Sequence, residues 1–394
     1  MAVAAAARAP GVHHSGEDSV CATDEVVILV SEDVTHDRRV LACIAAYSAA
    51  RLILVPADAG ATRCARWRIV LQAALLMLDS IACALPLRSF LRRKWGVRFS
   101  HRAAALPVSW RSFVRAQRVA ERLCATLRSV RTIHAHDLFC GIVGARLAAS
   151  LGAELVYDAH EVEFHRNRTN SLLRTSFDVV AERRVVALAR EVRVVNAPIA
   201  SLYESLYRIP PGRVRVVLND HFPECRSATA VEELAADRIA IVYVGAGTRG
   251  RQLDRLAQEA ARLRVPVHAF FLGEVPEIAI LSHWEIGAPE YQQDLLALTS
   301  RYRCAMWCCV DDVCLSYRLA LPNKFFQALA IGIPVIAADG TYLAELVREQ
   351  QLGLVFDGDN LEQIVADLRG PSFIDLARHA CSFRQALSTG TPRI

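Results

Sequence analysis

The stretch LPNKFFQALAIGIPVIAADG, from Leu321 to Gly340, is the part of the sequence from which the fold is interpreted. It contains Lys324, and the only other lysine among the 46 basic residues is Lys94. Lysine is a compact point charge that suits a phosphate oxygen, whereas arginine is a wide planar fork. Pro322 fits the first turn of a helix, where free N–H groups and the helix dipole already favour an anion.

The rest of this stretch predicts an apolar helix and then a buried strand. Phe325 to Ile331 is mainly apolar and Gly332 ends the helix, while Val335 to Ala338 reads as a short buried strand. We interpret the stretch as a phosphate-binding helix packed on a parallel sheet. The alternative is an ordinary helix–strand unit with a stray lysine.

Length and composition indicate a folded protein of two domains. The chain has 394 residues, of which 53% are hydrophobic and 22% charged, and its net charge is +5. Its twelve cysteines lack a disulfide-type spacing, which predicts a reducing, cytoplasmic environment. The densest group has no CxxC pair and is interpreted as buried strand residues rather than a metal site; it comprises Cys304, Cys308, Cys309 and Cys314.

Strand and helix patterns alternate in both halves, which predicts an α/β fold with a parallel sheet in each. We expect an N-terminal domain at 24–219, a linker at 220–237 and a C-terminal domain at 238–370. Residues 1–23 lack the charged-then-apolar order of a signal peptide and are expected to form a loose tail. For 371–394 we expect a helix, with packing back on the N-terminal domain as one arrangement.

An apolar and basic segment interrupts the N-terminal half, within an expected helical region at 65–130. Ile69 to Leu87 is almost entirely apolar, and Arg88 to Arg102 is basic with aromatic residues between the charges. Such a pair can lie on an anionic membrane surface, so peripheral membrane contact through 69–102 is one interpretation. The other is a buried helix followed by a solvated basic one. Nucleic acid is not expected as a partner, because no recognised motif accompanies the charge.

Two successive strands of the N-terminal half end in polar clusters. Thr132 to His136 runs into HAHD, which includes Asp137, and Glu154 to Tyr157 runs into DAHE, which includes His160 and Glu161. Ligands collect at the carboxyl ends of strands in parallel sheets. We therefore predict a site at this edge.

The second half opens with a glycine-rich loop. Ile239 to Val244 reads as a strand and runs into GAGTRG, which contains Gly245 and Gly247. This matches GxGxxG, the dinucleotide fingerprint, and Glu274 after the next strand could bind a ribose. A dinucleotide-binding site is therefore one interpretation of this loop.

The order of these motifs resembles the GT-B glycosyltransferases, specifically the retaining family 4 type. The matching pieces cover most of Val26 to Phe356: D-x-R-V at Asp37, HAHD at His134, YDAHE at Tyr157, the Asn219 turn, the glycine–arginine loop at Gly245, PNKFFQALAIGIPVIA at Pro322 and AELVREQQLGLVF at Ala344. The resemblance implies two Rossmann-like domains facing each other across a cleft. It also implies a nucleotide-sugar donor, UDP- or GDP-linked, held mainly by the C-terminal half, with no other cofactor.

The resemblance assigns residues to roles. Arg249 and Lys324 would neutralise the donor diphosphate as it leaves, and His136 would hydrogen-bond the reacting sugar. The remaining donor residues are Gly245, Gly247, Glu274, Asn323, Gln327 and Glu345, and the acceptor side comprises Asp37, His136, Asp137, His160 and Glu161. The sequence departs from the family where Leu319 and Gln327 replace the two Glu of an E-x7-E pair, and where Ser31 and Glu32 replace a glycine pair.

These observations favour a glycosyltransferase that passes a sugar to a hydroxyl of a glycan or lipid-linked acceptor with retention, in cell-surface polysaccharide or glycoconjugate synthesis. The lost E-x7-E pair leaves a non-catalytic binding or assembly subunit as an alternative, and GxGxxG with Glu274 leaves an NAD-dependent oxidoreductase. No Asp-x-Asp pair stands at a strand end, since Asp311 and Asp312 are adjacent, so we predict a metal-independent reaction.

Overall fold

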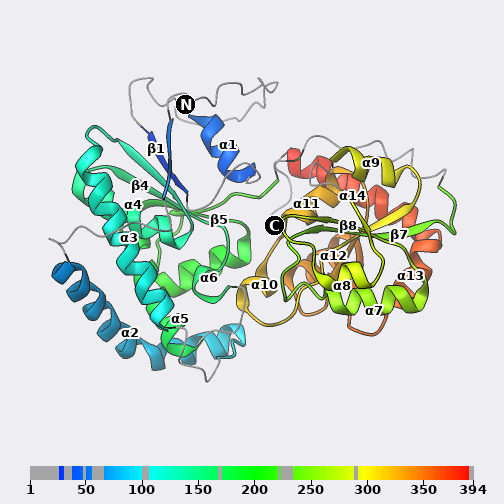
Figure 1. Ribbon diagram of the computed structural model, residues 1–394, viewed down its shortest axis with the longest axis horizontal. Helices are drawn as coiled ribbons and strands as arrows, with labels where there is room; N and C mark the ends of the chain where they lie inside the picture. Colours follow the sequence, from blue (N-terminus) through cyan, green and yellow to red (C-terminus); the bar gives the residue numbers. More distant parts are fainter. Residues whose placement is uncertain are drawn as a thin grey trace.

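The computed structural model describes residues 26–30, 38–47, 50–55, 66–99, 106–166, 171–220, 222, 234–287 and 292–389. They form two α/β domains side by side, each built on a six-stranded sheet (Figure 1). Every strand pair recorded in either sheet is parallel. The prediction of two α/β domains with parallel sheets is confirmed.

The N-terminal sheet has the strand order β2-β1-β3-β4-β5-β6. Its strands are β1 (Val26–Val30), β2 (Ala50–Leu54), β3 (Thr132–His136), β4 (Glu154–Ala159), β5 (Ala189–Val194) and β6 (Val214–Val216). All five residues of β1 are buried, as expected for a strand covered on both faces. The helices are α1 (Arg38–Ala46), α2 (Arg66–Trp95), α3 (Leu106–Thr126), α4 (Asp137–Leu151), α5 (Leu172–Leu188) and α6 (Ala197–Tyr207), with a short 3-10 turn at Glu163–His165.

A buried carboxylate ties the helices of this domain to its sheet. Glu182 on α5 accepts hydrogen bonds from the hydroxyls of Tyr157 on β4, at 2.7 Å, and of Tyr203 and Tyr207 on α6, at 2.6 and 2.5 Å. Burial raises the pKa of Glu182, against the effect of the three hydroxyl donors. This network fixes the strand that carries part of the polar cluster described below.

The C-terminal sheet has the strand order β12-β11-β10-β7-β8-β9. Its strands are β7 (Ile239–Gly245), β8 (Val267–Phe271), β9 (Glu285–Ile286), β10 (Arg303–Trp307), β11 (Val335–Ala338) and β12 (Gly353–Phe356). The helices are α7 (Leu253–Leu263), α8 (Glu277–Leu281), α9 (Gln292–Thr299), α10 (Leu315–Leu319), α11 (Asn323–Ala330), α12 (Tyr342–Gln350), α13 (Leu361–Arg369) and α14 (Ser372–Ser388). The stretch that opened the sequence analysis therefore forms α11 and β11, as predicted.

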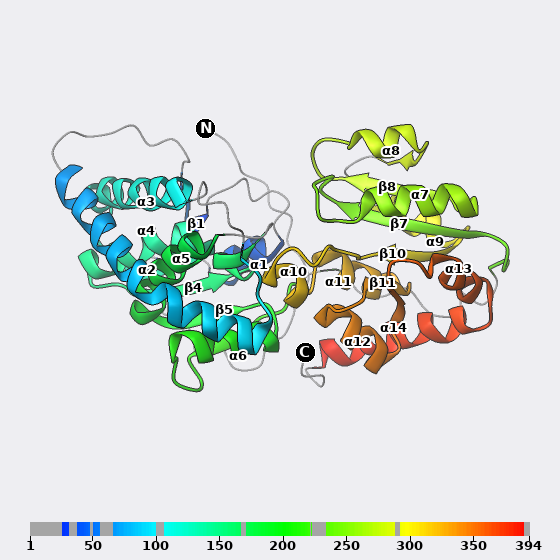
Figure 2. The same cartoon turned by 90° about the horizontal axis from the view of Figure 1, so that it is seen from below.

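The last helix packs within the C-terminal domain. α14 contacts α11, α13 and β12, and Ala380 and Phe383 lie in the same apolar core as α11 (Figure 2). Its Arg384 donates to the carbonyl oxygen of Phe222 at 2.9 Å and pairs with Asp220 in the predicted linker. α14 thus holds the linker against the C-terminal domain.

The short helix α10 joins the two domains. It follows β10 of the C-terminal sheet, yet Leu315 and Leu319 are buried in the core of the N-terminal domain. The Leu315 N–H donates to Nδ1 of His165 at 2.9 Å, and Asn196 Nδ2 donates to the Leu319 carbonyl at 2.6 Å. These bonds place the segment that leads into Lys324 against the N-terminal domain, and α10 lies between the two domains (Figure 2).

Candidate active site

Lys324 lies in the first turn of α11 with its ammonium group buried. Only 6% of the residue is exposed, and Nζ has no hydrogen-bond partner among the described residues. The ammonium lies 4.3 Å from the ring centroid of Tyr243, close enough for a cation–π contact. Burial lowers the pKa of Lys324 to about 8. A buried charge without an ionic partner is costly, so this site is suited to an incoming anion.

A second cation, Arg251, follows the glycine-rich loop and is near enough to Lys324 for its charge to be felt there. Its guanidinium stacks over the ring of Tyr317 at 4.9 Å, and its positive charge contributes to lowering the pKa of Lys324. The backbone is anchored as well, because the Arg251 carbonyl accepts from Trp307 Nε1 at 3.2 Å. Arg249, the residue that the resemblance selected, is exposed two positions earlier in the loop. Arg251 was not among the residues predicted from the sequence.

The glycine-rich loop follows β7 and is shaped by two close approaches. A Cβ at Gly247 would lie 2.6 Å from Cδ of Pro276, and a Cβ at Gly250 would lie 2.7 Å from Cε2 of Tyr317. Gly250 also has a φ of +89°, which L side chains rarely adopt. Side chains at these two positions would clash with Pro276 and Tyr317, so the glycines allow the loop to pack against them, next to the residue that stacks on Tyr317, Arg251.

The other predicted donor residues lie on segments that follow strands of the C-terminal sheet. Gln327 is buried on α11, whereas Asn323 at the start of α11 is exposed. Glu274, after β8, and Glu345, in the first turn of α12, are also exposed. With Gly245 and Gly247, these residues follow the carboxyl ends of β7, β8, β10 and β11, the edge at which parallel sheets bind ligands.

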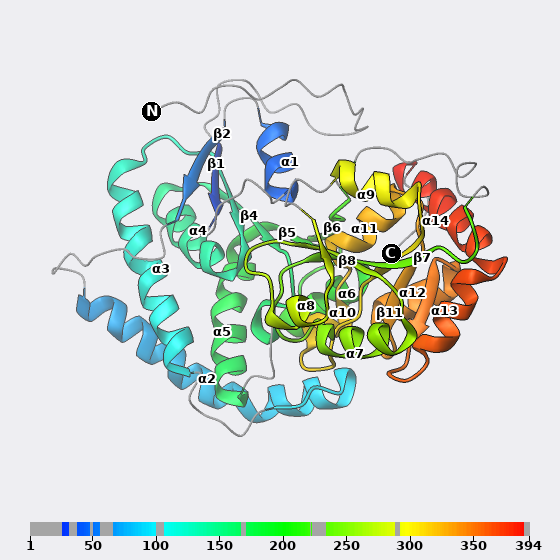
Figure 3. The same cartoon turned by 45° about the vertical axis from the view of Figure 1, so that its right-hand side comes forward.

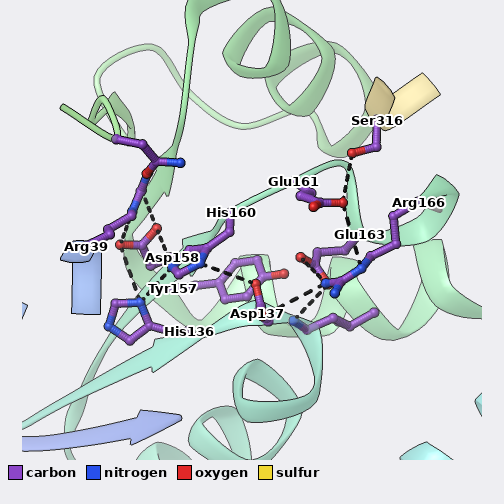
Figure 4. A network of polar contacts seen from close by, with 12 residues as sticks. Arg39, His136, Asp137, Tyr157, Asp158, His160, Glu161, Glu163, Arg166 and Ser316 are labelled. Carbon is purple, nitrogen blue, oxygen red and sulfur yellow. Dashed lines mark hydrogen bonds and ion pairs between the residues drawn. The ribbon is translucent and has the colours of Figure 1, made fainter. Parts of the chain in front are cut away.

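In the N-terminal domain, β3 and β4 bring their polar ends together, as predicted. His136 Nδ1 lies 2.9 Å from Nε2 of His160, so one of these nitrogens donates to the other (Figure 4). Asp158 lies between them and α1, where Arg39 Nε donates to Asp158 Oδ2 at 3.1 Å and a second guanidinium nitrogen bonds Oδ1. The predicted Asp37 precedes α1 and lies outside the described residues.

The electrostatics of this cluster separate one charged group from neutral ones. Burial raises the pKa of Asp158, but the nearby positive charge, chiefly that of Arg39, outweighs burial and holds this pKa well below its usual range. Burial lowers the pKa of His136 to about 4. His136 is therefore neutral at physiological pH, where it can accept or donate a hydrogen bond but carries no proton to give as an imidazolium.

A second set of carboxylates connects the cluster to α10. Glu163 accepts from the Leu138 N–H at 3.2 Å and from Arg166 at 3.2 Å. Glu161 accepts from the hydroxyl of Ser316 on α10 at 3.1 Å, so the two halves touch at a predicted acceptor-side residue (Figure 4). Asp137 belongs to the same group, with Oδ1 3.8 Å from His160 Nδ1. Sequence reasoning missed Glu163 and Arg166, which lie just beyond the DAHE motif.

Two groups of side chains here have the chemistry and spacing of metal ligands. One comprises Cys43, His134 and His136, and the other comprises His136, Asp158 and His160, each with ligand atoms within 4.8 Å of one another. Both oxygens of Asp158 already bond the guanidinium of Arg39, so a cation occupies that carboxylate. Metal independence stays a prediction.

No protein-family model matches the chain, and no curated protein sequence matches it. Solved structures do. Sucrose-phosphate synthase from Thermosynechococcus elongatus is similar with a TM-score of 0.57 and 16% identity, over 92% of this chain and 94% of that one. HepE from Anabaena in complex with UDP-glucose is similar with a TM-score of 0.57 and 14% identity, over 93% and 95%. A UDP-glucosyltransferase from Polygonum tinctorium gives a TM-score of 0.53 and 12% identity, over 94% and 95%.

At these identities the similarity concerns the fold. Both six-stranded parallel sheets are included, because the matches extend over nearly the full length of each pair of chains. The neighbours include proteins named as a sucrose-phosphate synthase and a UDP-glucosyltransferase, which have the GT-B fold. The chain has the GT-B fold.

Proposed function

We propose that this protein is a glycosyltransferase that transfers a sugar from a nucleotide-sugar donor, with a UDP or GDP leaving group, to a hydroxyl of a glycan or lipid-linked acceptor. The observation that supports it most is the buried ammonium of Lys324, which has no hydrogen-bond partner among the described residues and feels the positive charge of Arg251. Two cations on segments that follow strands of one parallel sheet suit the diphosphate of a nucleotide sugar. HepE, of the same fold, has been solved with UDP-glucose.

The chemistry needs electrostatic help and a positioned sugar more than a covalent intermediate. The bond between the anomeric carbon and the phosphate oxygen breaks, and negative charge collects on the departing diphosphate, where Lys324 and Arg251 stabilise it. A new bond forms from the acceptor oxygen to the anomeric carbon. For transfer with retention, the hydroxyl proton passes to the leaving phosphate oxygen on the same face, and neutral His136 hydrogen-bonds the sugar.

Calorimetric titration of UDP, GDP, their sugars and NAD into the wild type and two arginine variants tests the donor site. We expect micromolar binding of one nucleoside diphosphate. Arg251→Met should weaken it by about ten- to a hundredfold, because a charge-assisted contact is lost. Arg249→Met, an exposed arginine in the same loop, is the matched control and should bind like the wild type.

Other results would contradict the assignment. If Arg249→Met lost diphosphate binding and Arg251→Met bound like the wild type, then Arg249, and not Arg251, would bind the diphosphate. Binding of NAD, and of neither diphosphate, would replace the nucleotide-sugar site with a dinucleotide site.

One observation favours a second candidate, a binding or assembly subunit without turnover. The acid pair of the resembling family is absent: Leu319 packs in the N-terminal core and Gln327 is buried on α11. Glutamine can still hydrogen-bond a hydroxyl, but it lacks the charge. Donor binding without sugar release, measured as free diphosphate formed with glycan and lipid-linked acceptor extracts, would favour this candidate over the transferase.

A further inference from the structure

Helix α2 carries a long row of exposed apolar side chains. One side of the helix packs against α5 and buries residues such as Ala73, Leu76 and Leu91. The opposite side exposes large apolar side chains, up to 64% for Leu78 and 70% for Leu85. We call this row the α2 apolar face; it comprises Val70, Leu71, Leu75, Leu78, Ile81 and Leu85. Contiguous exposed rows of this kind mark interaction surfaces.

By length and composition, one helix among the described residues could cross a membrane, and it is the segment Ile69–Trp95 of α2. An 18-residue window within this segment has a mean hydropathy of 1.9, and 28% of that window is buried in the protein. A single such helix is weak evidence for spanning. α2 instead lies along the outside of the N-terminal domain and packs on it through its buried side (Figures 1 and 3). It exposes one long side, as an interfacial helix does.

Basic residues continue the apolar row toward the end of the helix. Leu85, Arg88 and Arg92 follow one another at spacings of three and four, so they share a side of the helix. Arg88, Arg92 and Arg93 are all exposed. The only acid between residues 66 and 99 is Asp79, whose carboxylate is bound to Arg184 of α5 at 2.9 Å. The surface therefore presents apolar side chains followed by arginines for which no ion pair is recorded among the described residues.

This charge pattern separates the occupants that could cover the α2 apolar face. A second copy of the chain would bring further basic residues and no free acid of α2 to the contact, and like charges across an interface oppose association. An anionic bilayer supplies hydrocarbon for the apolar row and phosphate headgroups for the arginines. The charge complementarity fits the bilayer.

We propose that the α2 apolar face and the arginines that follow it are a docking surface for an anionic lipid bilayer. This surface belongs to α2, and its docking is independent of the reaction assigned to the protein. The basic end of α2 is also the end joined to α10, because Arg318 bonds the Trp95 carbonyl (Figure 2). Docking would thus bring the contact between α10 and the N-terminal cluster near the bilayer surface.

Flotation with vesicles tests the proposal on the full chain. The wild type should float with vesicles of three parts phosphatidylcholine to one part phosphatidylglycerol, and not with phosphatidylcholine alone. Leu78→Asn/Leu85→Asn and Arg88→Glu/Arg92→Glu should each bind the anionic vesicles at least about thirtyfold more weakly. The matched controls are Ile280→Asn/Leu281→Asn on α8, which are equally exposed apolar residues, and Arg215→Glu/Arg301→Glu; both should bind like the wild type.

A measurement on the unmutated chain makes the test independent of how the variants fold. Hydrogen exchange of the peptide covering 69–95 should slow when anionic vesicles are added. The proposal is overturned if the wild type does not bind anionic vesicles, or if the α2 variants bind them as well as the controls do. It is also overturned if light scattering shows that the wild type is a dimer and the α2 variants are monomers. In the last case a second copy covers the face.

Discussion

A Lys324→Met variant is expected to lose at least about a hundredfold in affinity for the nucleoside diphosphate and yet to unfold at a higher temperature than the wild type. Methionine has a similar length and no charge, so the diphosphate loses its buried cation. In the empty protein the ammonium is buried without a hydrogen-bond partner among the described residues, and its removal relieves a desolvation cost. We expect a gain on the order of 1–3 kcal/mol in the free energy of unfolding. Calorimetric titration and thermal melting measure the two effects.

The chain offers a matched control for this variant. Lys94 is the only other lysine, and its exposed ammonium donates to Ser205 Oγ at 2.7 Å, far along the sequence from the donor site. Lys94→Met should leave both the affinity and the melting temperature unchanged. If Lys324→Met bound the diphosphate like the wild type, Lys324 would have no part in the donor site. If it melted earlier, the ammonium would have a stabilising partner in the folded protein.

The pH dependence of the wild type provides a second readout of the same ammonium. Because its folded pKa is about 8 and its ordinary value is 10.5, Lys324 is charged in both states below pH 8 and opposes folding there. That cost disappears as the pH rises from 8 to 10.5, since the folded protein has already released the proton. The stability gap between Lys324→Met and wild type should therefore narrow over this range. The wild type should also lose up to about tenfold in diphosphate affinity per pH unit above 8.

Much of this site was predictable from the sequence, because local patterns place it. Lys324 stood out as a lysine in an arginine-rich chain, and Pro322 and Gly332 delimited its helix. His136 and His160 could be paired because parallel strands end at a common edge, and the structure places them 2.9 Å apart. The helix start places Lys324, and the ends of two parallel strands place the two histidines, so local sequence patterns were sufficient in both cases.

The remainder depends on contacts between residues distant in the sequence. Nothing local distinguishes Arg251 from Arg249. Arg251 stacks on Tyr317, a residue far along the sequence, and its charge acts on Lys324, whereas Arg249 is exposed. The sequence also could not predict that Leu315 is buried in the N-terminal core, because α10 follows a strand of the C-terminal domain. The contacts of α10 with the N-terminal domain can be seen only when the positions of the two domains are known.

Arg39→Met is expected to lower the free energy of unfolding by about 3–5 kcal/mol, the largest stability effect that we anticipate. The variant leaves Asp158 buried without its guanidinium, since both side chains are about 4% and 3% exposed in the wild type. It also removes the donor to the Val217 carbonyl at 2.7 Å and to Asn219 Oδ1 at 3.1 Å, which hold the end of the N-terminal domain. Urea unfolding measures the loss. Arg184→Met, which breaks the exposed pair with Asp79, is the control and should cost no more than about 1 kcal/mol.

A second variant shows whether the lost stability of Arg39→Met comes from the unpaired charge of Asp158 or from the missing packing and hydrogen bonds of Arg39. If an uncompensated carboxylate causes it, Arg39→Met/Asp158→Asn should be more stable than Arg39→Met alone, because the second change removes the stranded charge. The pH dependence should agree. In the wild type the depressed pKa of Asp158 stabilises the fold above its unfolded value and is lost only in strong acid. In Arg39→Met the largest effect opposing burial is removed, so the pKa of Asp158 rises. The folded variant then takes up a proton as the pH falls, and its deficit against the wild type should shrink between pH 7 and 4. A deficit that stays constant over that range would mean that Arg39 stabilises the domain through packing and its bonds to Val217 and Asn219, and that Asp158 does not need its charge balanced.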